Sequence, residues 1–248
     1  MYRETNPVHP ANAAATSLSN DEPCLKNLDP QQIKFLDEEC ILVDENDNAI
    51  GTASKKECHL MANIRKGMLH RAFSVFLFNS VGELLITQRS DEKITFPGYF
   101  TNTCCSHPLA IPSEHTEDPL IGVKRAAHRR MVSELGISPE ELPLESFHYL
   151  TRIKYMAASN DVWGEHEIDY ILFIQRDIKC LRPNPNEVTS TIYLPRDKID
   201  YFVECLSGTN KSLTPWFQLI LDIFLKKWWD NLENLKAFES HDVIHNLN

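Results

Sequence analysis

The chain has 248 residues, of which 42% are hydrophobic and 24% charged, so it can form one large domain or two small ones, and disorder along its whole length is excluded. Its 25 Lys and Arg residues against 35 Asp and Glu residues give a formal net charge of −10. This is the wrong sign for binding nucleic acid or an anionic membrane through bulk charge, so an anionic ligand would need a local basic cluster.

Seven cysteines, including the adjacent Cys104 and Cys105, do not resemble the dense, even-numbered framework of a small secreted domain. We therefore expect a reducing compartment and a cytoplasmic protein. No membrane span is expected, because the apolar stretch 219–225 is interrupted by Asp222. A transit peptide stays open for the Ala- and Ser-rich start, and a peroxisomal location stays open although residues 244–248 do not form a Ser-Lys-Leu signal.

The first half of the chain predicts a leader followed by two hairpins. Residues 1–29 are polar, rich in Pro, Ala and Asn, and without periodicity, which predicts a disordered leader. A strand at 40–43 and a returning strand at 49–51 flank a turn of Asx residues. A second antiparallel pair is predicted at 71–79 and 84–89, because both segments are rich in aromatic and aliphatic residues typical of buried strands.

The second half mixes helices with strands. Residues 118–135 have helical spacing, with Pro119 in the first turn and Gly136 as the stop. Further strands are predicted at 147–156, 168–175 and 190–194, and helices at 196–206 and 215–231. Because this order lacks a regular βαβ alternation, it predicts an α+β sandwich around a mixed, mostly antiparallel sheet.

A group of histidines and glutamates forms a candidate metal site. His59, His70 and His107 occur in polar segments next to turns, and Glu165 and Glu167 lie two residues apart on a strand, so their side chains share one face. Carboxylates held close together repel, and a bound cation relieves that repulsion. Three imidazoles and two carboxylates suit Zn²⁺, Mn²⁺ or a similar ion. The alternative, a surface ion pair between Glu165 and a Lys or Arg, is not rejected by the sequence.

The same loops contain a candidate thiol and most of the informative basic residues. Cys105 lies two residues before His107, whereas the cysteines outside the adjacent pair have no such setting and are interpreted as structural or incidental. Basic residues near these loops, interpreted either as solvated charges or as a phosphate clamp, are Lys55, Arg89, Lys93, Arg129 and Arg130.

Several motifs closely resemble type I isopentenyl-diphosphate isomerases: HRAFSVFLFN at 70–79, TFPG at 95–98, TNTCCSHP at 101–108, WGEHEIDY at 163–170 and TPW at 214–216. The resemblance runs from about Asp29 to Asn231, and TNTCCSHP together with WGEHE is specific to that family. It implies a Nudix-type α/β/α sandwich, with a single domain at 30–235, a Nudix core at about 68–218 and a C-terminal tail at 236–248. It also implies conversion of isopentenyl diphosphate to dimethylallyl diphosphate in isoprenoid precursor biosynthesis.

Compared with the Nudix hydrolase box, G-x5-E-x7-R-E-U-x-E-E-x-G-U with U aliphatic, this chain has lost most of the carboxylates. His115 stands at the first Gly, Ile121, Arg130 and Ser133 stand at three Glu positions, and only Glu134 remains. This argues against one alternative, a Nudix hydrolase of a prenyl or nucleoside diphosphate. A second alternative, a non-catalytic metal-binding module, leaves the thiol and the basic cluster without a role.

The resemblance also implies roles for individual residues. A divalent metal, Zn, Mn or Mg, would be bound by His59, His70, His107, Glu165 and Glu167, and a Mg²⁺ bridging the diphosphate would be held with Glu134. The catalytic residues would be Cys105, Glu167 and Tyr155, and the substrate-binding residues Lys55, Arg89, Lys93, Ser106, Arg130 and Trp216. The expected partner is a small prenyl diphosphate, with no nucleic acid and no membrane, and the chain is expected to be a monomer.

Overall fold

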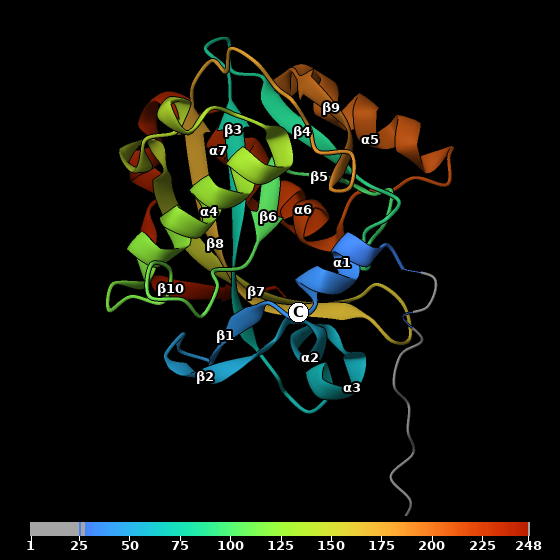
Figure 1. Ribbon diagram of the computed structural model, residues 1–248. Helices are drawn as coiled ribbons and strands as arrows, with labels where there is room; N and C mark the ends of the chain where they lie inside the picture. The colour runs from blue at the N-terminus through green and yellow to red at the C-terminus, as the bar shows by residue number, and fades with distance from the viewer. Residues whose placement is uncertain (1–24, 26–27, 248) are drawn as a thin grey trace, which may run out of the picture.

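The structure, a computed structural model, describes residue 25 and residues 28–247 (Figure 1). Most of the expected leader, residues 1–24, 26 and 27, lies outside these described residues. The strands are β1 Glu39–Val43, β2 Ala49–Ser54, β3 His70–Phe78, β4 Leu84–Arg89, β5 Phe100–Thr101, β6 Cys104–Ser106, β7 His148–Ala158, β8 Gly164–Gln175, β9 Val188–Leu194 and β10 Ser240–Asn246. The helices are α1 Pro30–Phe35, α2 Lys55–His59, α3 Met61–Ile64, α4 Pro119–Leu135, α5 Ile199–Ser207, α6 Pro215–Ile220 and α7 Lys226–Trp229.

The strands form one mixed sheet. Its central path runs β10-β7-β8-β3-β1-β2, and β4 and β6 also pair with β3, while β5 and β9 pair with β4. Two pairings, β3 with β8 and β10 with β7, are parallel, and the others are antiparallel. The prediction of a mixed, mostly antiparallel sheet in an α+β sandwich is therefore confirmed.

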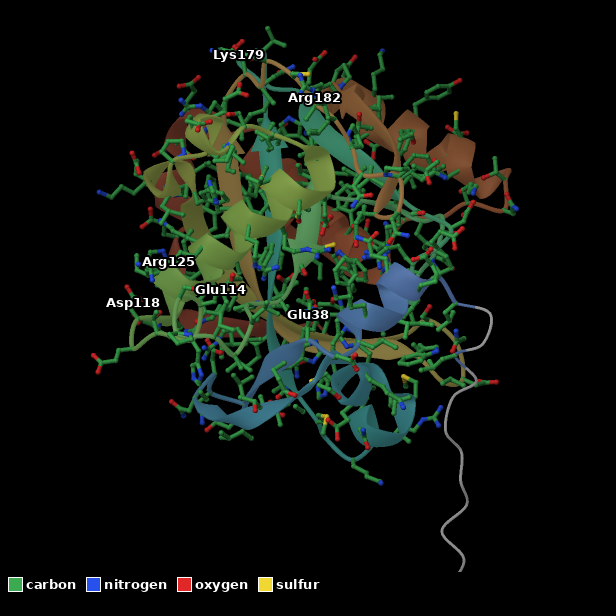
Figure 2. The ribbon with its side chains drawn as sticks, in the orientation of Figure 1. Glu38, Glu114, Asp118, Arg125, Lys179 and Arg182 are labelled. Carbon is green, nitrogen blue, oxygen red and sulfur yellow. The ribbon has the colours of Figure 1, made fainter. Side chains whose placement is uncertain are left out.

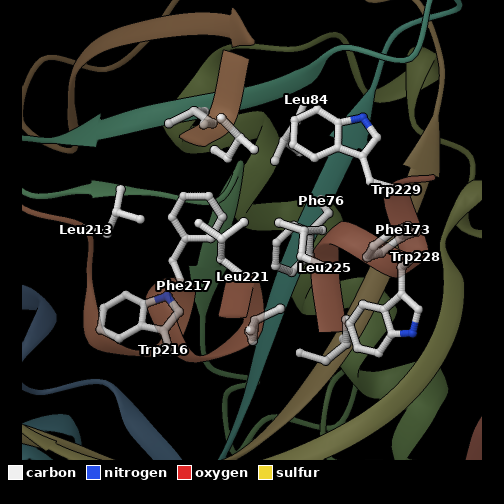
Figure 3. Close-up of a cluster of buried hydrophobic side chains, with 14 of the residues drawn as sticks. Phe76, Leu84, Phe173, Leu213, Trp216, Phe217, Leu221, Leu225, Trp228 and Trp229 are labelled. Atoms are coloured by element: carbon white, nitrogen blue, oxygen red, sulfur yellow. The ribbon is translucent and has the colours of Figure 1, made fainter. Parts of the chain in front are cut away.

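Side chains alternate between the two faces of the sheet along the central strands, and both faces are buried. On one face, Phe73, Val75 and Leu77 of β3 pack with Val123 and Met131 of α4. The other face forms the cluster drawn in Figure 3, which combines alternate residues of β3, such as Phe76 and Phe78, with the helical segment that begins at α6. The sheet is thus the middle layer between α4 and the C-terminal helices, as Figure 1 also shows.

Several elements differ from the sequence prediction. The helix predicted at 215–231 consists of α6, a π-helical segment Leu221–Leu225 and α7. The strand predicted at 168–175 from its apolar residues begins at Gly164, so it includes Glu165 and Glu167, which were also expected on a strand. The short helices α1, α2 and α3 and the strands β5 and β6 were not predicted. Residues 240–246, expected within a C-terminal tail, form β10 beside β7.

Local sequence signals explain how two helices begin. Ser54 and Glu57 form a capping box, in which each side chain bonds the backbone of the other, and this starts α2. The Asp118 side chain accepts a hydrogen bond from Leu120 N at the start of α4, and Gly136 ends α4 in the left-handed conformation at φ 61°. Among the residues described, no helix has the length and apolar character needed to cross a bilayer.

A loop that packs on the N-terminal part of α4 fixes the position of His107. In this loop the Glu114 carboxylate accepts hydrogen bonds from Leu109 N at 2.8 Å and from Arg129 Nε at 2.6 Å. Arg129 Nη2 also donates to His107 O at 3.3 Å. Figure 2 labels Glu114 near the end of α4 where the helix begins. The loop lies so close to the helix that Gly122 leaves no room for a larger residue.

We predict that Gly122→Ala destabilises the protein. A Cβ at this position would lie 1.9 Å from Glu114 O, so the loop must move. Although Gly to Ala within a helix ordinarily stabilises by about 1 kcal/mol, overpacking should dominate and cost about 1–3 kcal/mol. The free energy of unfolding in urea measures the effect. The control is Gly208→Ala, whose Cβ would meet nothing nearer than Cys205 O at 3.9 Å. Equal stability of the two variants would contradict this packing.

Candidate active site

The register of three adjacent strands brings the central residues of the site together. Glu167 of β8 lies opposite Tyr155 of β7 on one side and opposite His70 of β3 on the other. Residues that face each other across a sheet point to the same side. All three side chains therefore point to the sheet face that packs against α6. The Tyr155 hydroxyl donates to Glu167 Oε2 at 2.5 Å.

The five predicted metal ligands meet at one point. His59, His70, His107, Glu165 and Glu167 are all buried, and one ligand atom from each lies within 4.8 Å of the others. The three imidazole centroids are 4.7–4.9 Å apart. These residues come from α2, β3, the segment after β6, and β8. The alternative of a surface ion pair for Glu165 is wrong, because this buried carboxylate contacts His59 Nε2 at 2.8 Å.

Hydrogen bonds around the cluster leave donor atoms that fit a metal ion. His59 Nδ1 lies 2.7 Å from Lys55 O, and since a carbonyl only accepts, Nδ1 must donate, which leaves Nε2 facing the cluster. The fully buried His70 has no hydrogen bond at either ring nitrogen, although Nε2 lies 3.3 Å from Glu167 Oε1. Buried polar atoms without partners are rare, and a cation here would bind one of these two nitrogens. Three nitrogen and two oxygen ligands fit a divalent metal.

The charges in the cluster support each other. Burial lowers the pKa of His70, but Glu167, Cys58 and Glu165 together outweigh burial and raise the pKa to about 9. Burial and the neighbouring His70 and His59 lower the pKa of His107 well below its usual value. Burial raises the pKa of both carboxyl groups, Glu165 and Glu167, but the histidines outweigh it and lower both values. The carboxylates are thus charged and attract a cation.

A cavity opens beside the cluster. The predicted site residues that line it are Lys55, His59, Arg89, Lys93, Cys105, Ser106, His107, Tyr155, Glu165, Glu167 and Trp216. His70 contributes to the metal cluster but is not among the lining residues, and neither are Arg130 and Glu134. The structure therefore brings nearly all predicted residues to one cavity, with Arg130 and Glu134 next to it.

The two adjacent thiols point to opposite faces of β6, as expected for an extended segment. Cys104 is 1% exposed and packs in the core beneath α4. Cys105 lines the cavity, 3.8 Å from Thr101 Oγ1. Burial raises the pKa of Cys105 to about 12, against the lowering effect of Arg89. Cys105 comes from the strand on one edge of β3, whereas Glu167 comes from the strand on the other edge.

Trp216 covers the apolar side of the cavity. Its indole Nε1 donates to Asn102 Oδ1 at 3.1 Å, which fixes the ring. The ring centroid lies 5.9 Å from that of Tyr155, and the Arg89 guanidinium lies 5.6 Å above the indole. Arg89 also donates to the carbonyls of Thr95 and Phe96 at 2.7–3.2 Å. An aromatic wall and a fixed guanidinium thus lie side by side.

The other basic residues are held by carboxylates and by α1. Lys93 Nζ contacts Glu187 Oε2 at 2.5 Å, and Arg130 Nη2 contacts the same oxygen at 3.1 Å. Arg130 also binds Glu134 Oε1, with its Nη2 at 2.5 Å and its Nε at 2.7 Å. The aromatic ring of Phe35 in α1 lies near both Lys55 and Arg130, with Lys55 Nζ 6.0 Å and Arg130 Cζ 5.5 Å from its centroid.

The sequence did not predict the residues that contact these cations or their partners, above all Glu187, Gln32 and Phe35. Gln32 and Phe35 lie in the short α1 and line the cavity. The only signal for that helix is Asp29 followed by Pro30, a cap and a first-turn proline. Glu187 follows an Asn-Pro-Asn turn and carries no signal of its own.

Comparisons with known proteins agree with this geometry. A family model for the NUDIX domain matches residues 68–217. The chain is 56% identical over 221 residues to isopentenyl-diphosphate Delta-isomerase 1 of Mesocricetus auratus, an alignment that covers 89% of this chain and 97% of the relative. It is 49% identical over 222 residues to the chloroplastic isopentenyl-diphosphate Delta-isomerase II of Arabidopsis thaliana, covering 88% and 78% of the two chains.

A solved structure supports the fold alone. The crystal structure of a NUDIX hydrolase from Alicyclobacillus acidocaldarius superimposes with a TM-score of 0.50 at 10% identity, covering 68% of this chain and 96% of that chain. The Nudix-type fold is thereby confirmed. The high identities to the named relatives identify the family within this fold. The chain carries a NUDIX domain and belongs to the isopentenyl-diphosphate isomerase family.

Proposed function

We propose that this chain converts isopentenyl diphosphate to dimethylallyl diphosphate by adding a proton at one carbon and removing one from another, through a carbocation. The observation that carries the proposal is one cavity lined by a thiol, Cys105, and by a Tyr155–Glu167 pair from the opposite side of β3. A five-carbon chain between them has a proton-exchanging group on each side. The relatives named as isopentenyl-diphosphate isomerases supply the substrate.

The diphosphate would serve as an anchor and not as a leaving group. Four basic residues in or beside the cavity supply the charge, and the Ser106 hydroxyl adds a hydrogen-bonding group; the basic residues are Lys55, Arg89, Lys93 and Arg130. Binding energy at the diphosphate would position the alkene, which is far less polar than the diphosphate and has no group that can form a strong hydrogen bond or ion pair. Glu134, the remaining box carboxylate, is our candidate to hold a Mg²⁺ bridging the diphosphate.

The tertiary cation between the two proton transfers needs an apolar, electron-rich wall. Trp216 supplies its indole face, and such a contact is worth about 0.5–2 kcal/mol when it is desolvated. Trp216 and its neighbour Phe217 are buried, at 3% and 0% exposure, so this wall also keeps water from the cation. Tyr155 would relay protons to and from Glu167, to which it donates a short hydrogen bond.

The His/Glu cluster would hold a divalent ion, which we propose to be Zn²⁺, Mn²⁺ or Mg²⁺. When bound, that ion would supply Lewis acidity next to Glu167 and neutralise the two buried carboxylates. The protein's own part is to orient Glu167 through Tyr155 and His107, whose Nε2 lies 2.7 Å from Glu167 Oε1. The cytoplasmic or peroxisomal location and the monomeric state stay predictions.

The overall reaction is tested with purified protein and isopentenyl diphosphate in D₂O. We expect deuterium in the recovered substrate and in dimethylallyl diphosphate, because each turnover exchanges protons with groups that equilibrate with solvent. Mass spectrometry measures the deuterium, and a phosphate assay runs in parallel. Release of phosphate without any dimethylallyl product would instead favour the Nudix hydrolase.

The thiol assignment predicts different outcomes for two neighbouring variants. Cys105→Ala should lower turnover by roughly 10²–10⁴-fold or more, since it removes a proton-transferring group from the cavity. Cys104→Ala removes a buried thiol from the core beneath α4 and should leave turnover within a few-fold of wild type. Steady-state kinetics of both variants, each checked for folding, decides the matter. Loss of activity in Cys104→Ala alone would show that the wrong thiol was assigned.

The metal assignment predicts that each histidine is required for binding the ion. Substituting His59, His70 or His107 with Ala should lower bound divalent metal and activity together, because a lost ligand opens the site. Elemental analysis of the purified variants gives the metal content. His128→Ala is the control, because this half-buried histidine of α4 faces Pro139 O at 3.3 Å and lies outside the cluster. Full metal content in all three cluster variants would refute the site.

A further inference from the structure

Glu187 is a buried carboxylate that the catalytic proposal does not use. It precedes β9 and is 3% exposed. Its backbone is fixed, because Ser90 N donates to Glu187 O at 3.0 Å and Glu187 N donates to Asn184 O at 2.9 Å. Asn184 N in turn donates to Glu134 O in α4 at 2.8 Å. The Glu187 carboxylate thus occupies a defined position between β4, α4 and the cavity.

Its two oxygens contact three side chains from three different parts of the chain. Oε2 accepts from Lys93 Nζ at 2.5 Å and from Arg130 Nη2 at 3.1 Å. Oε1 accepts from Gln32 Nε2 of α1 at 3.2 Å. Both cationic partners are proposed ligands of the diphosphate, and Lys93 lines the cavity itself.

The electrostatics make such a residue necessary. Four cations crowd the same region, and burial alone would favour the neutral form of a lysine. Burial lowers the pKa of Lys93, and Glu187 acts against this effect. Burial raises the pKa of Glu187 itself, but Lys93 and Arg130 outweigh it and lower this pKa to about 2. The carboxylate is therefore charged throughout the physiological range.

We propose that Glu187 is a positioning residue for the diphosphate anchor, which holds Lys93 and Arg130 in place and charged without being consumed or transferring a proton. The contacts that carry the proposal are the two hydrogen bonds to a single carboxylate oxygen. The proposal rests on the proposed function for the identity of the anion. The part of the proposal that concerns Glu187, the ordering of two cations for an anionic ligand, can be tested by anion binding alone.

The main test is Glu187→Gln, which keeps the size of the side chain and removes its charge. Isothermal calorimetry with inorganic diphosphate measures anion binding without any turnover. We expect the Kd to rise roughly tenfold or more, the effect of losing a charge-assisted interaction that fixes two ligands. With isopentenyl diphosphate, KM should rise by a similar factor while kcat stays within a few-fold of wild type, because the reacting groups are untouched.

The pH profile supplies a readout that a purely structural role would not change. The charged groups that act on Lys93 come from four elements: Glu187 before β9, Arg89 of β4, Lys55 of α2 and Glu134 of α4. Lys93 binds an anion only below its pKa, and removing the Glu187 charge lowers that pKa further. The rise of KM at alkaline pH should therefore begin at a lower pH in Glu187→Gln than in wild type.

Two further variants keep the test decisive. Glu187→Asp retains the charge, so its KM should begin to rise at the same alkaline pH as in wild type. Its KM should also rise less than that of Glu187→Gln. Asp47→Asn is the matched control, because Asp47 is also buried and ion-paired, with Arg71 at 2.7 Å and Arg152 at 3.0 Å, and is not among the residues lining the cavity. Asn tolerates the positive φ of 67° at this position. It should leave diphosphate affinity unchanged, whatever stability it loses.

Several outcomes would overturn the proposal. One is wild-type affinity for diphosphate in folded Glu187→Gln. Another is an equal shift, in the Asp and Gln variants, of the alkaline pH at which KM begins to rise. A loss of kcat with unchanged KM would assign Glu187 to the reaction itself. If the wild-type protein binds diphosphate but yields no dimethylallyl product, the proposed function fails while the calorimetric comparison still tests Glu187.

Discussion

The site depends on one constraint, the burial of the Glu167 carboxylate at the centre of three adjacent strands. A buried charge is tolerated only when it is paired and hydrogen-bonded. Glu167 meets this condition through Tyr155 on the neighbouring β7 and through His107, at 2.5 and 2.7 Å. Because the sheet register places these groups, a shift of one residue in β8 would turn Glu167 to the other face and dismantle the site.

The same logic explains how an acidic chain could bind an anion. The net charge of −10 repels a diphosphate at long range, but salt screens such repulsion beyond about 10 Å. Within that distance, the cavity gathers several of the chain's few basic residues. Their mutual repulsion is reduced by Glu134 and Glu187, which both bind Arg130. The cations are therefore arranged before a ligand arrives, and less binding energy is lost in ordering them.

Much of the sheet and the main helix were predictable from the sequence, because β3 and β4 are rich in aromatic and aliphatic residues and α4 is long, with helical spacing. The five metal ligands could be grouped from the sequence, because Glu165 and Glu167 share a strand face and the three histidines lie in polar segments next to turns. The family resemblance then implied that all five bind one ion. Short elements that depend on contacts with the rest of the protein were not predicted. β6 has three residues and takes its structure from pairing with β3, and α1 has six residues and depends on docking to the loop at Asn186.

The altered Nudix box fits the replacement of diphosphate cleavage by diphosphate anchoring. In a hydrolase of this family, several box carboxylates hold Mg²⁺ against the phosphates. Here Arg130 stands at one of those positions and binds Glu134, the remaining box carboxylate, at 2.5 Å. A guanidinium cannot bind a metal ion, but it can donate a hydrogen bond to a phosphate oxygen. The Arg at this position thus replaces a metal ligand, and in the proposed function it would add an anion ligand. That change favours a cavity that retains its diphosphate while the chemistry proceeds at carbon.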